Sequence, residues 1–163
     1  VDINPQSVSI SETNLQFQYE TKSKIHTRCA NATDLSFIKD SHIAYICTHP
    51  PYANIIKYSK NVDGDISLLT VEEFLKEMTV VAQEAYRVLR KGKACAVMIG
   101  DMRRYGKVVP LGFWVMECFL SVGFVSKEII IKEQHNCRST DYWEKQNNNF
   151  LLLAHEYIFV FQK

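Results

Sequence analysis

The sequence predicts an α/β fold with a mostly parallel sheet. Apolar runs of strand length alternate with segments whose apolar residues recur at helical spacing. The clearest examples are the apolar run at residues 43–48, the periodic segment that follows Thr70, and the apolar run at residues 94–99. Because helical crossovers join neighbouring parallel strands, this alternation favours one sheet with mostly parallel strands.

The first third of the chain has only weak sequence signals for secondary structure. Residues 1–3 resemble the end of a strand, and a turn at residues 4–5 leads into a helix expected over residues 7–15. Residues 25–30 are a further strand candidate. Residues 54–67 form a polar loop with Asp and Gly, a kind of segment that often covers a site.

The most strongly marked helix begins after Thr70. Thr70 and Glu73 form a capping box, in which each side chain accepts a hydrogen bond from a backbone N–H at the start of the helix. The cations Arg90 and Lys91, followed by Gly92, predict the end of this helix. Its apolar stripe has alternating spacings of four and three and consists of Phe74, Met78, Val81, Ala85 and Val88.

The rest of the chain continues the alternation. A basic loop at residues 103–107 precedes a second helix, which Pro110 opens and Gly123 closes. The β-branched run at residues 124–132 predicts a strand. Two short apolar runs between residues 150 and 161 supply the last strand material.

Length and composition indicate a single domain over residues 1–163. Hydrophobic residues make up 47% of the chain and charged residues 23%, which is ordinary for a globular protein. The net charge of +1 does not by itself indicate a nucleic-acid-binding protein, so any nucleic-acid surface must be local.

The five cysteines indicate a reducing, cytoplasmic location with buried thiols, because their number is odd and most lie in apolar runs. The longest apolar runs fall short of the ~20 residues that a membrane span needs, so no membrane partner is expected. No His and Cys residues have the four-ligand spacing of a zinc site, so no metal is expected. The sequence leaves the oligomeric state open.

The most informative motif is Thr-His-Pro-Pro-Tyr at residues 48–52, directly after the first strong apolar run. Its two prolines stop the strand, stiffen the backbone and remove two N–H donors. They leave carbonyl groups free to accept hydrogen bonds and hold an aromatic ring at the carboxyl edge of the sheet, where open α/β folds bind ligands. The motif therefore predicts a site for a flat group that bears an amino nitrogen.

This motif resembles the catalytic motif of S-adenosylmethionine-dependent amino-methyltransferases, most of all those that act on DNA. The acidic strand end at residues 2–5 is similar to the segment that binds the cofactor ribose, and residues 30–35 to the segment near the cofactor adenine. Residues 86–92 resemble the end of the helix before the central strand, and residues 153–161 the last strands of DNA amino-methylases. The resemblance covers nearly the whole chain.

The resemblance implies a Rossmann-like methyltransferase sheet, mostly parallel with an antiparallel C-terminal strand and with helices on both faces. It also implies a first strand and a glycine-rich cofactor loop before Asp2. Since no glycine precedes Gly64, we expect an N-terminally truncated fragment that binds cofactor weakly or not at all.

The implied reaction is methyl transfer from S-adenosylmethionine to the exocyclic amino group of adenine or cytosine in DNA. That nitrogen is a poor nucleophile because its lone pair is delocalised into the ring, and acceptors bonded to its hydrogens make it more reactive. The implied catalytic residues are His49, Pro50, Pro51 and Tyr52, with the His49 ring and the Pro50 carbonyl as acceptors and Tyr52 stacked on the flipped base. The family more often has Asp, Asn or Ser in place of His49, and only a neutral imidazole has an acceptor nitrogen.

The resemblance also implies the cofactor-binding residues Asp2, Ile3, Asn31, Ala32 and Thr48. The Asp2 carboxylate would accept hydrogen bonds from the ribose hydroxyls. Asn31 stands where the family usually has Asp, and its side-chain oxygen can still accept from the adenine amino group. Plainer roles stay open, since Asp2 could cap the helix that follows and Asn31 could be a turn residue.

DNA is the expected partner, and Arg103, Arg104, Lys107 and Arg138 are the expected nucleic-acid contacts. Arg138 belongs to a polar loop at residues 134–149 that mixes cations with aromatic residues. Two alternatives stay open: an RNA methyltransferase acting on the guanine amino group, and a non-catalytic binding module that retains the fold. The sequence does not distinguish an adenine target from a cytosine target.

Overall fold

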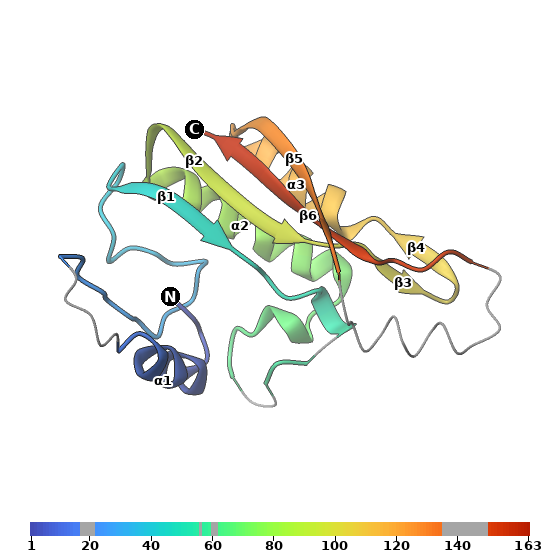
Figure 1. The fold of residues 1–163 in the computed structure, drawn as a ribbon, viewed down its shortest axis with the longest axis horizontal. Coiled ribbons are helices and arrows are strands. Elements are labelled where there is room, and N and C mark those ends of the chain that lie inside the picture. Colours follow the sequence, from blue (N-terminus) through green and yellow to red (C-terminus); the bar gives the residue numbers. More distant parts are fainter. Residues whose placement is uncertain (17–21, 56, 60–61, 135–149) are drawn as a thin grey trace.

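The structure is a computed structural model that describes residues 1–16, 22–55, 57–59, 62–134 and 150–163. Its main body is a sheet with two long helices packed on it, and the N-terminal segment lies beyond the β1 edge of that sheet (Figure 1). The sequence-predicted α/β class is confirmed.

The sheet has four strands in the order β1-β2-β6-β5. β1 and β2 are parallel, while β6 is antiparallel to both of its neighbours, so only the C-terminal strand opposes the common direction. This arrangement confirms the mostly parallel sheet with an antiparallel last strand. The four strands, in sheet order, are Ile43–Thr48, Leu89–Ile99, His155–Gln162 and Val125–Glu133.

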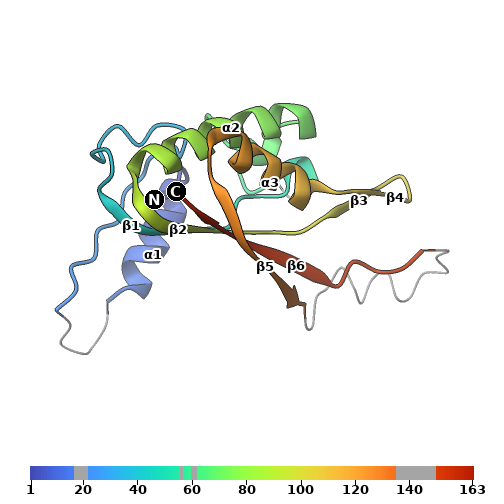
Figure 2. The ribbon, with the colours of Figure 1, turned by 90° about the horizontal axis from the view of Figure 1, so that it is seen from above.

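The helices α2 (Val71–Val88) and α3 (Leu111–Val122) cover one face of the sheet (Figure 2). Aromatic rings fill the layer between the helices and the sheet. For example, Phe119 of α3 stacks on Phe161 of β6 with the ring centroids 5.1 Å apart. The largest fully buried side chains in this layer include Phe74, Met78, Phe119, Phe159 and Phe161. Burial of such side chains is the main force that holds the helices on the sheet.

The helix α1 (Pro5–Asn14) lies toward the opposite side of the molecule (Figure 2), but none of its residues is buried. Its sequence is mostly polar and offers no apolar stripe to pack on a sheet. Among the described helices, only α2 and α3 therefore pack on the four-stranded sheet. The described helices therefore lie on both sides of the sheet, with α1 the one that has no buried residue.

The start of α2 is as predicted, but its end is not. The Thr70 hydroxyl accepts a hydrogen bond from the Glu73 N–H at 3.3 Å, and the Glu73 carboxylate accepts from the Thr70 N–H at 3.0 Å. The helix stops at Val88, because Leu89 is buried and extended and begins β2 by pairing with Ile43. The polar residues that follow continue the strand instead of ending the helix.

Two other segments differ from expectation. Residues 25–30 form no strand, and their only ladder contact is an isolated parallel bridge between Asp2 and Cys29. The basic loop is a hairpin of two short strands, β3 (Met102–Arg104) and β4 (Lys107–Val109). The helix closed by Gly123, which has a left-handed φ of 114°, is confirmed as α3.

The described cysteines are free, and their burial corrects the sequence-based expectation. Cys95 and Cys118 are buried, whereas Cys29 and Cys47 are exposed. Cys137 lies outside the described residues. Within the described ranges, no helix combines the length and the apolar character that crossing a membrane requires.

Candidate functional site

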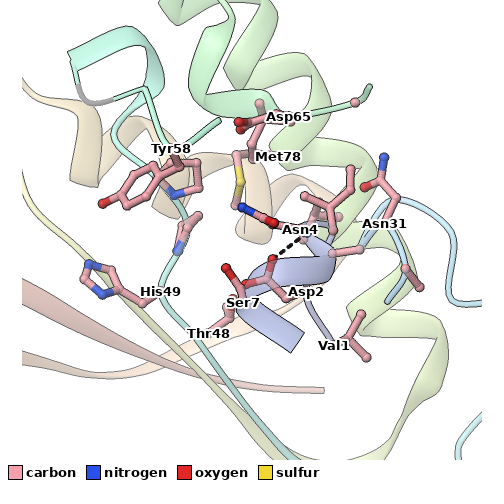
Figure 3. A pocket seen from close by; sticks show the side chains of 18 residues that line it. Val1, Asp2, Asn4, Ser7, Asn31, Thr48, His49, Tyr58, Asp65 and Met78 are labelled. Atoms are coloured by element: carbon pink, nitrogen blue, oxygen red, sulfur yellow. Dashed lines mark hydrogen bonds between the residues drawn. The ribbon is translucent and has the colours of Figure 1, made fainter. Parts of the chain in front are cut away.

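A pocket of about 360 Å³ lies at the carboxyl end of β1 (Figure 3). All five predicted cofactor-binding residues line it, although they come from three separate parts of the chain. Met78 and Val81 of α2 add an apolar wall. The predicted residues that meet in the pocket are Asp2, Ile3, Asn31, Ala32 and Thr48.

Asp2 is held at the pocket by its backbone. Its N–H donates to the Arg28 carbonyl at 3.2 Å and its carbonyl accepts from the Ala30 N–H at 3.0 Å, which gives the bridge to Cys29. The Asp2 carboxylate accepts from the Asn4 N–H at 2.7 Å. The helix cap is Asn4 itself, so the plainer role proposed for Asp2 as the cap is wrong.

Asn31 is a turn residue and a pocket residue at once. Its Oδ1 accepts a hydrogen bond from the Thr33 N–H at 3.0 Å, which is the turn role that the sequence left open. A side-chain amide oxygen has two lone pairs, so one remains for a ligand. Gly64 packs closely on the same side chain, since a Cβ at Gly64 would lie 3.0 Å from Asn31 Nδ2.

The polar loop after the motif forms another wall of the pocket, as the sequence predicted for a covering loop. Tyr58, Gly64, Asp65 and Ile66 line the pocket from this loop. Asp65 accepts hydrogen bonds from the Ser59 hydroxyl at 2.5 Å and the Ser67 N–H at 2.8 Å. Burial alone would raise the pKa of Asp65, but these hydrogen bonds outweigh it and lower the pKa, so the carboxylate stays charged.

The four predicted catalytic residues do not all face the pocket. His49, Pro50 and Pro51 line it, and Figure 3 shows His49 and Tyr58 on the same side. The Tyr52 ring packs instead on Gly100, directly after β2. The packing is close, since a Cβ added at Gly100 would lie 3.2 Å from the ring. The Tyr52 hydroxyl donates to Glu156 Oε1 at 2.5 Å.

Glu156 of β6 is the charged residue that the sequence reasoning missed. It is 6% exposed, and its Oε2 accepts a hydrogen bond from Lys132 Nζ at 2.6 Å. His49 Nε2 lies 3.6 Å from Glu156 Oε1. One sign was present in the sequence, because a glutamate inside an apolar strand is rarely buried unless it is paired.

Charge and burial set the protonation of this cluster. Burial favours the neutral carboxyl of Glu156, but the hydrogen bonds from Lys132 and Tyr52 and the positive charge of Lys132 outweigh it and lower the pKa. Burial, reinforced by the hydrogen bond to Glu156, raises the pKa of Tyr52 above its usual range. Tyr52 is therefore a protonated donor, and Glu156 a charged acceptor, over the ordinary pH range.

The predicted nucleic-acid contacts Arg103, Arg104 and Lys107 lie on the β3–β4 hairpin, which extends from the carboxyl end of β2 (Figure 2). Arg103 donates to the carbonyls of Gly106 and Leu151, both at 2.8 Å, and Arg104 donates to Asn54. Two of the three cations thus brace the hairpin.

Tyr105, which the sequence reasoning did not single out, occupies the tip of the hairpin and is 96% exposed. Arg138 lies outside the described residues. In the part of the chain that the structure describes, no three His, Cys, Asp or Glu side chains are grouped as metal ligands.

Comparison with solved structures identifies the class of fold. A candidate DNA modification methylase from Thermus thermophilus, solved with S-adenosyl-L-methionine, is 24% identical with a TM-score of 0.59, covering 81% of this chain and 52% of that one. The cytosine-N4-specific PvuII DNA methyltransferase is 16% identical with a TM-score of 0.65, covering 82% and 47%. The chain thus spans about half the length of these two proteins.

A third similar structure, a SAM-dependent methyltransferase from Methanosarcina mazei, matches this chain over most of the length of both proteins. It is 16% identical with a TM-score of 0.59, and the match covers 99% of this chain and 79% of that one. The fold is therefore that of the S-adenosylmethionine-dependent methyltransferases.

A family profile described as DNA methylase, for N6 and N4 methyltransferases, matches residues 43–163. The chain belongs to this N6/N4 DNA methylase family. A search of curated proteins found no match.

Proposed function

We propose that the protein transfers a methyl group from S-adenosylmethionine to the exocyclic amino group of adenine or cytosine in DNA. The observation that carries the proposal is the meeting of Asp2, Asn31 and Thr48 with His49 and Pro50 on one pocket at the end of β1. Family membership supports the same reaction, because the motif lies within the matched residues.

The residues of the pocket fit the cofactor. S-adenosylmethionine supplies the methyl group when bound, and it offers ribose hydroxyls, a flat adenine and a charged end to the protein. The Asp2 carboxylate suits hydroxyl donors, while Ile3 and Val81 provide apolar contact for a ring. The volume of about 360 Å³ falls in the range of small-ligand sites.

The base would meet the His49-Pro50-Pro51 turn. A carbonyl and a neutral imidazole nitrogen can accept the two amino hydrogens, which makes the nitrogen a better nucleophile. Placing that nitrogen in line with the methyl group then supplies much of the rate enhancement. Tyr52 stays part of the proposal as a stacking surface, with its hydroxyl anchored on Glu156.

The β3–β4 hairpin is the proposed DNA contact. Lys107 is exposed near its tip, and Tyr105 stands beside it with its ring in solvent. A cation suits a phosphate and an exposed ring suits an unpaired base, so the hairpin matches nucleic acid in charge and in stacking surface. The free, exposed thiols of Cys29 and Cys47 support a cytoplasmic location.

The proposal is tested by methyl transfer from labelled S-adenosylmethionine to DNA and, in parallel, to tRNA. We expect label in DNA, and His49→Ala should lower the rate by about 100-fold or more while the circular dichroism spectrum stays unchanged. His42→Ala, which removes an exposed histidine just before β1, is the matched control and should keep full activity.

Label found only in tRNA would favour the RNA alternative. Full activity of His49→Ala would remove His49 from the reaction. Cofactor binding without transfer to any nucleic acid would support the non-catalytic module.

A further inference from the structure

We propose that Glu156 is a positioning residue that fixes the Tyr52 ring and leaves His49 Nδ1 as the accepting nitrogen of the imidazole. Its catalytic consequence rests on the proposed methyl transfer, but its structural claim does not. Glu156 lies 104 residues from Tyr52 in the sequence, and the fold brings the last strand beside the motif.

The first observation is the division of labour between the two oxygens of the buried carboxylate. Oε2 accepts from Lys132 Nζ at 2.6 Å, and Oε1 accepts from the Tyr52 hydroxyl at 2.5 Å. The ammonium group balances the negative charge, which a buried carboxylate needs in order to stay ionised. The hydroxyl bond fixes the outer end of the Tyr52 ring, and Gly100 packs against the same end, since a Cβ there would lie 3.2 Å from Cε1 and 3.3 Å from the hydroxyl oxygen.

The second observation concerns His49. Its Nε2 lies 3.6 Å from Oε1, slightly beyond hydrogen-bonding length, and its ring meets the Tyr52 ring edge to face with the centroids 5.9 Å apart. A carboxylate only accepts hydrogen bonds, so this neighbour favours the imidazole form that carries its proton on Nε2. Nδ1 then keeps its lone pair, which an acceptor for an amino hydrogen requires.

The tautomer can be read without any activity. We would record two-bond ¹H–¹⁵N spectra of the full chain labelled with ¹⁵N-histidine and assign His49 by the loss of its signals in His49→Ala. In the wild type, neutral His49 should show the Nε2–H form alone. Glu156→Gln keeps the shape but removes the charge, and it should show a mixture of both tautomers.

Two further variants keep the test decisive. Glu156→Asp retains the charge but withdraws it by one methylene, so it should also give the mixture, even if Glu156→Gln does not fold. Glu128→Gln removes an exposed carboxylate from β5. Glu128 pairs with Val160 and lies on the same face of the sheet as Glu156, so this control should leave the His49 signals unchanged.

The second measurement is the rate of methyl transfer. Glu156→Gln should lower kcat at least about tenfold while the dissociation constant for S-adenosylmethionine stays the same, because displacing a reacting group by about 1 Å can cost about 100-fold. Identical His49 tautomers in the wild type and both Glu156 variants would overturn the proposal. If the tautomers change but the wild type methylates no nucleic acid, only the proposed function fails.

Discussion

At the residue scale, two polar residues of the pocket have both a structural role and a place in the pocket lining. Asn31 closes a turn through Thr33 and also lines the pocket. Asp2 forms a backbone bridge and turns its carboxylate toward the helix start. A short polar residue can serve both purposes because its side chain bonds locally and leaves a second lone pair free.

The lowered pKa of Glu156 implies that the stability of the protein decreases in acid. Its folded-state pKa is lowered from the usual 4.5, so its stabilising effect is fully present above that value and is lost as the pH falls through the lower folded-state pKa. We expect the free energy of unfolding in urea to fall more steeply between about pH 6 and about pH 3 for the wild type than for Glu156→Gln.

The matched control for this titration is Glu128→Gln, which should keep the wild-type steepness. Equal slopes for the wild type and Glu156→Gln would show that the Lys132 and Tyr52 bonds do not favour the charged carboxylate.

At the element scale, local patterns placed the well-marked segments correctly. The apolar run closed by two prolines is β1, with the predicted limits, because a strand cannot continue past residues that lack N–H donors. The capping box is formed because both of its bonds lie within one turn. The predicted end of α2 was wrong because Leu89 pairs with Ile43, and local sequence patterns do not reveal a contact between residues so far apart.

The capping box has a measurable effect. Thr70→Ala removes the oxygen that accepts the Glu73 N–H, and we expect a loss of about 1 kcal/mol in the free energy of unfolding. Thr70→Ser retains that oxygen and should lose less than half as much. Since α2 carries Met78 into the pocket, cofactor binding should weaken along with stability. A Thr70→Ala protein as stable as Thr70→Ser would argue against the cap.

At the scale of the whole molecule, the N-terminal segment before β1 is joined to the helix-and-sheet body by hydrogen bonds to the last turns of α2. Arg87 of α2 joins them, since it donates to the carbonyls of Leu35 and Ile38 and pairs with Asp40. By contrast, β2 and β6 lie in the middle of the sheet, and the second half of β2 and alternate residues of β6 are buried. Residues of both parts line the pocket.

Hydrogen exchange measures this difference. Amides of α1 should exchange fastest among the helices, and those of β2 and β6 slowest, because local opening is least costly where nothing is buried. S-adenosylmethionine, added at a concentration that saturates even weak binding, should slow exchange at residues 1–8 and 30–34, and Asp2→Ala should reduce that protection. Protection that appears elsewhere, or is unchanged in Asp2→Ala, would place the cofactor outside this pocket.

The sequence by itself determined the fold class, β1 and its proline turn, the start of α2, and the five residues that meet in the pocket. The first three depend on periodicity and backbone chemistry, which are local along the chain, and the pocket residues depend on the resemblance of several short motifs to a known family. Only the tertiary structure decided the role of Glu156, the direction of the Tyr52 ring and the bracing of Arg103. Each of these depends on contacts between residues that are distant in the sequence, and only the packing of the sheet creates those contacts.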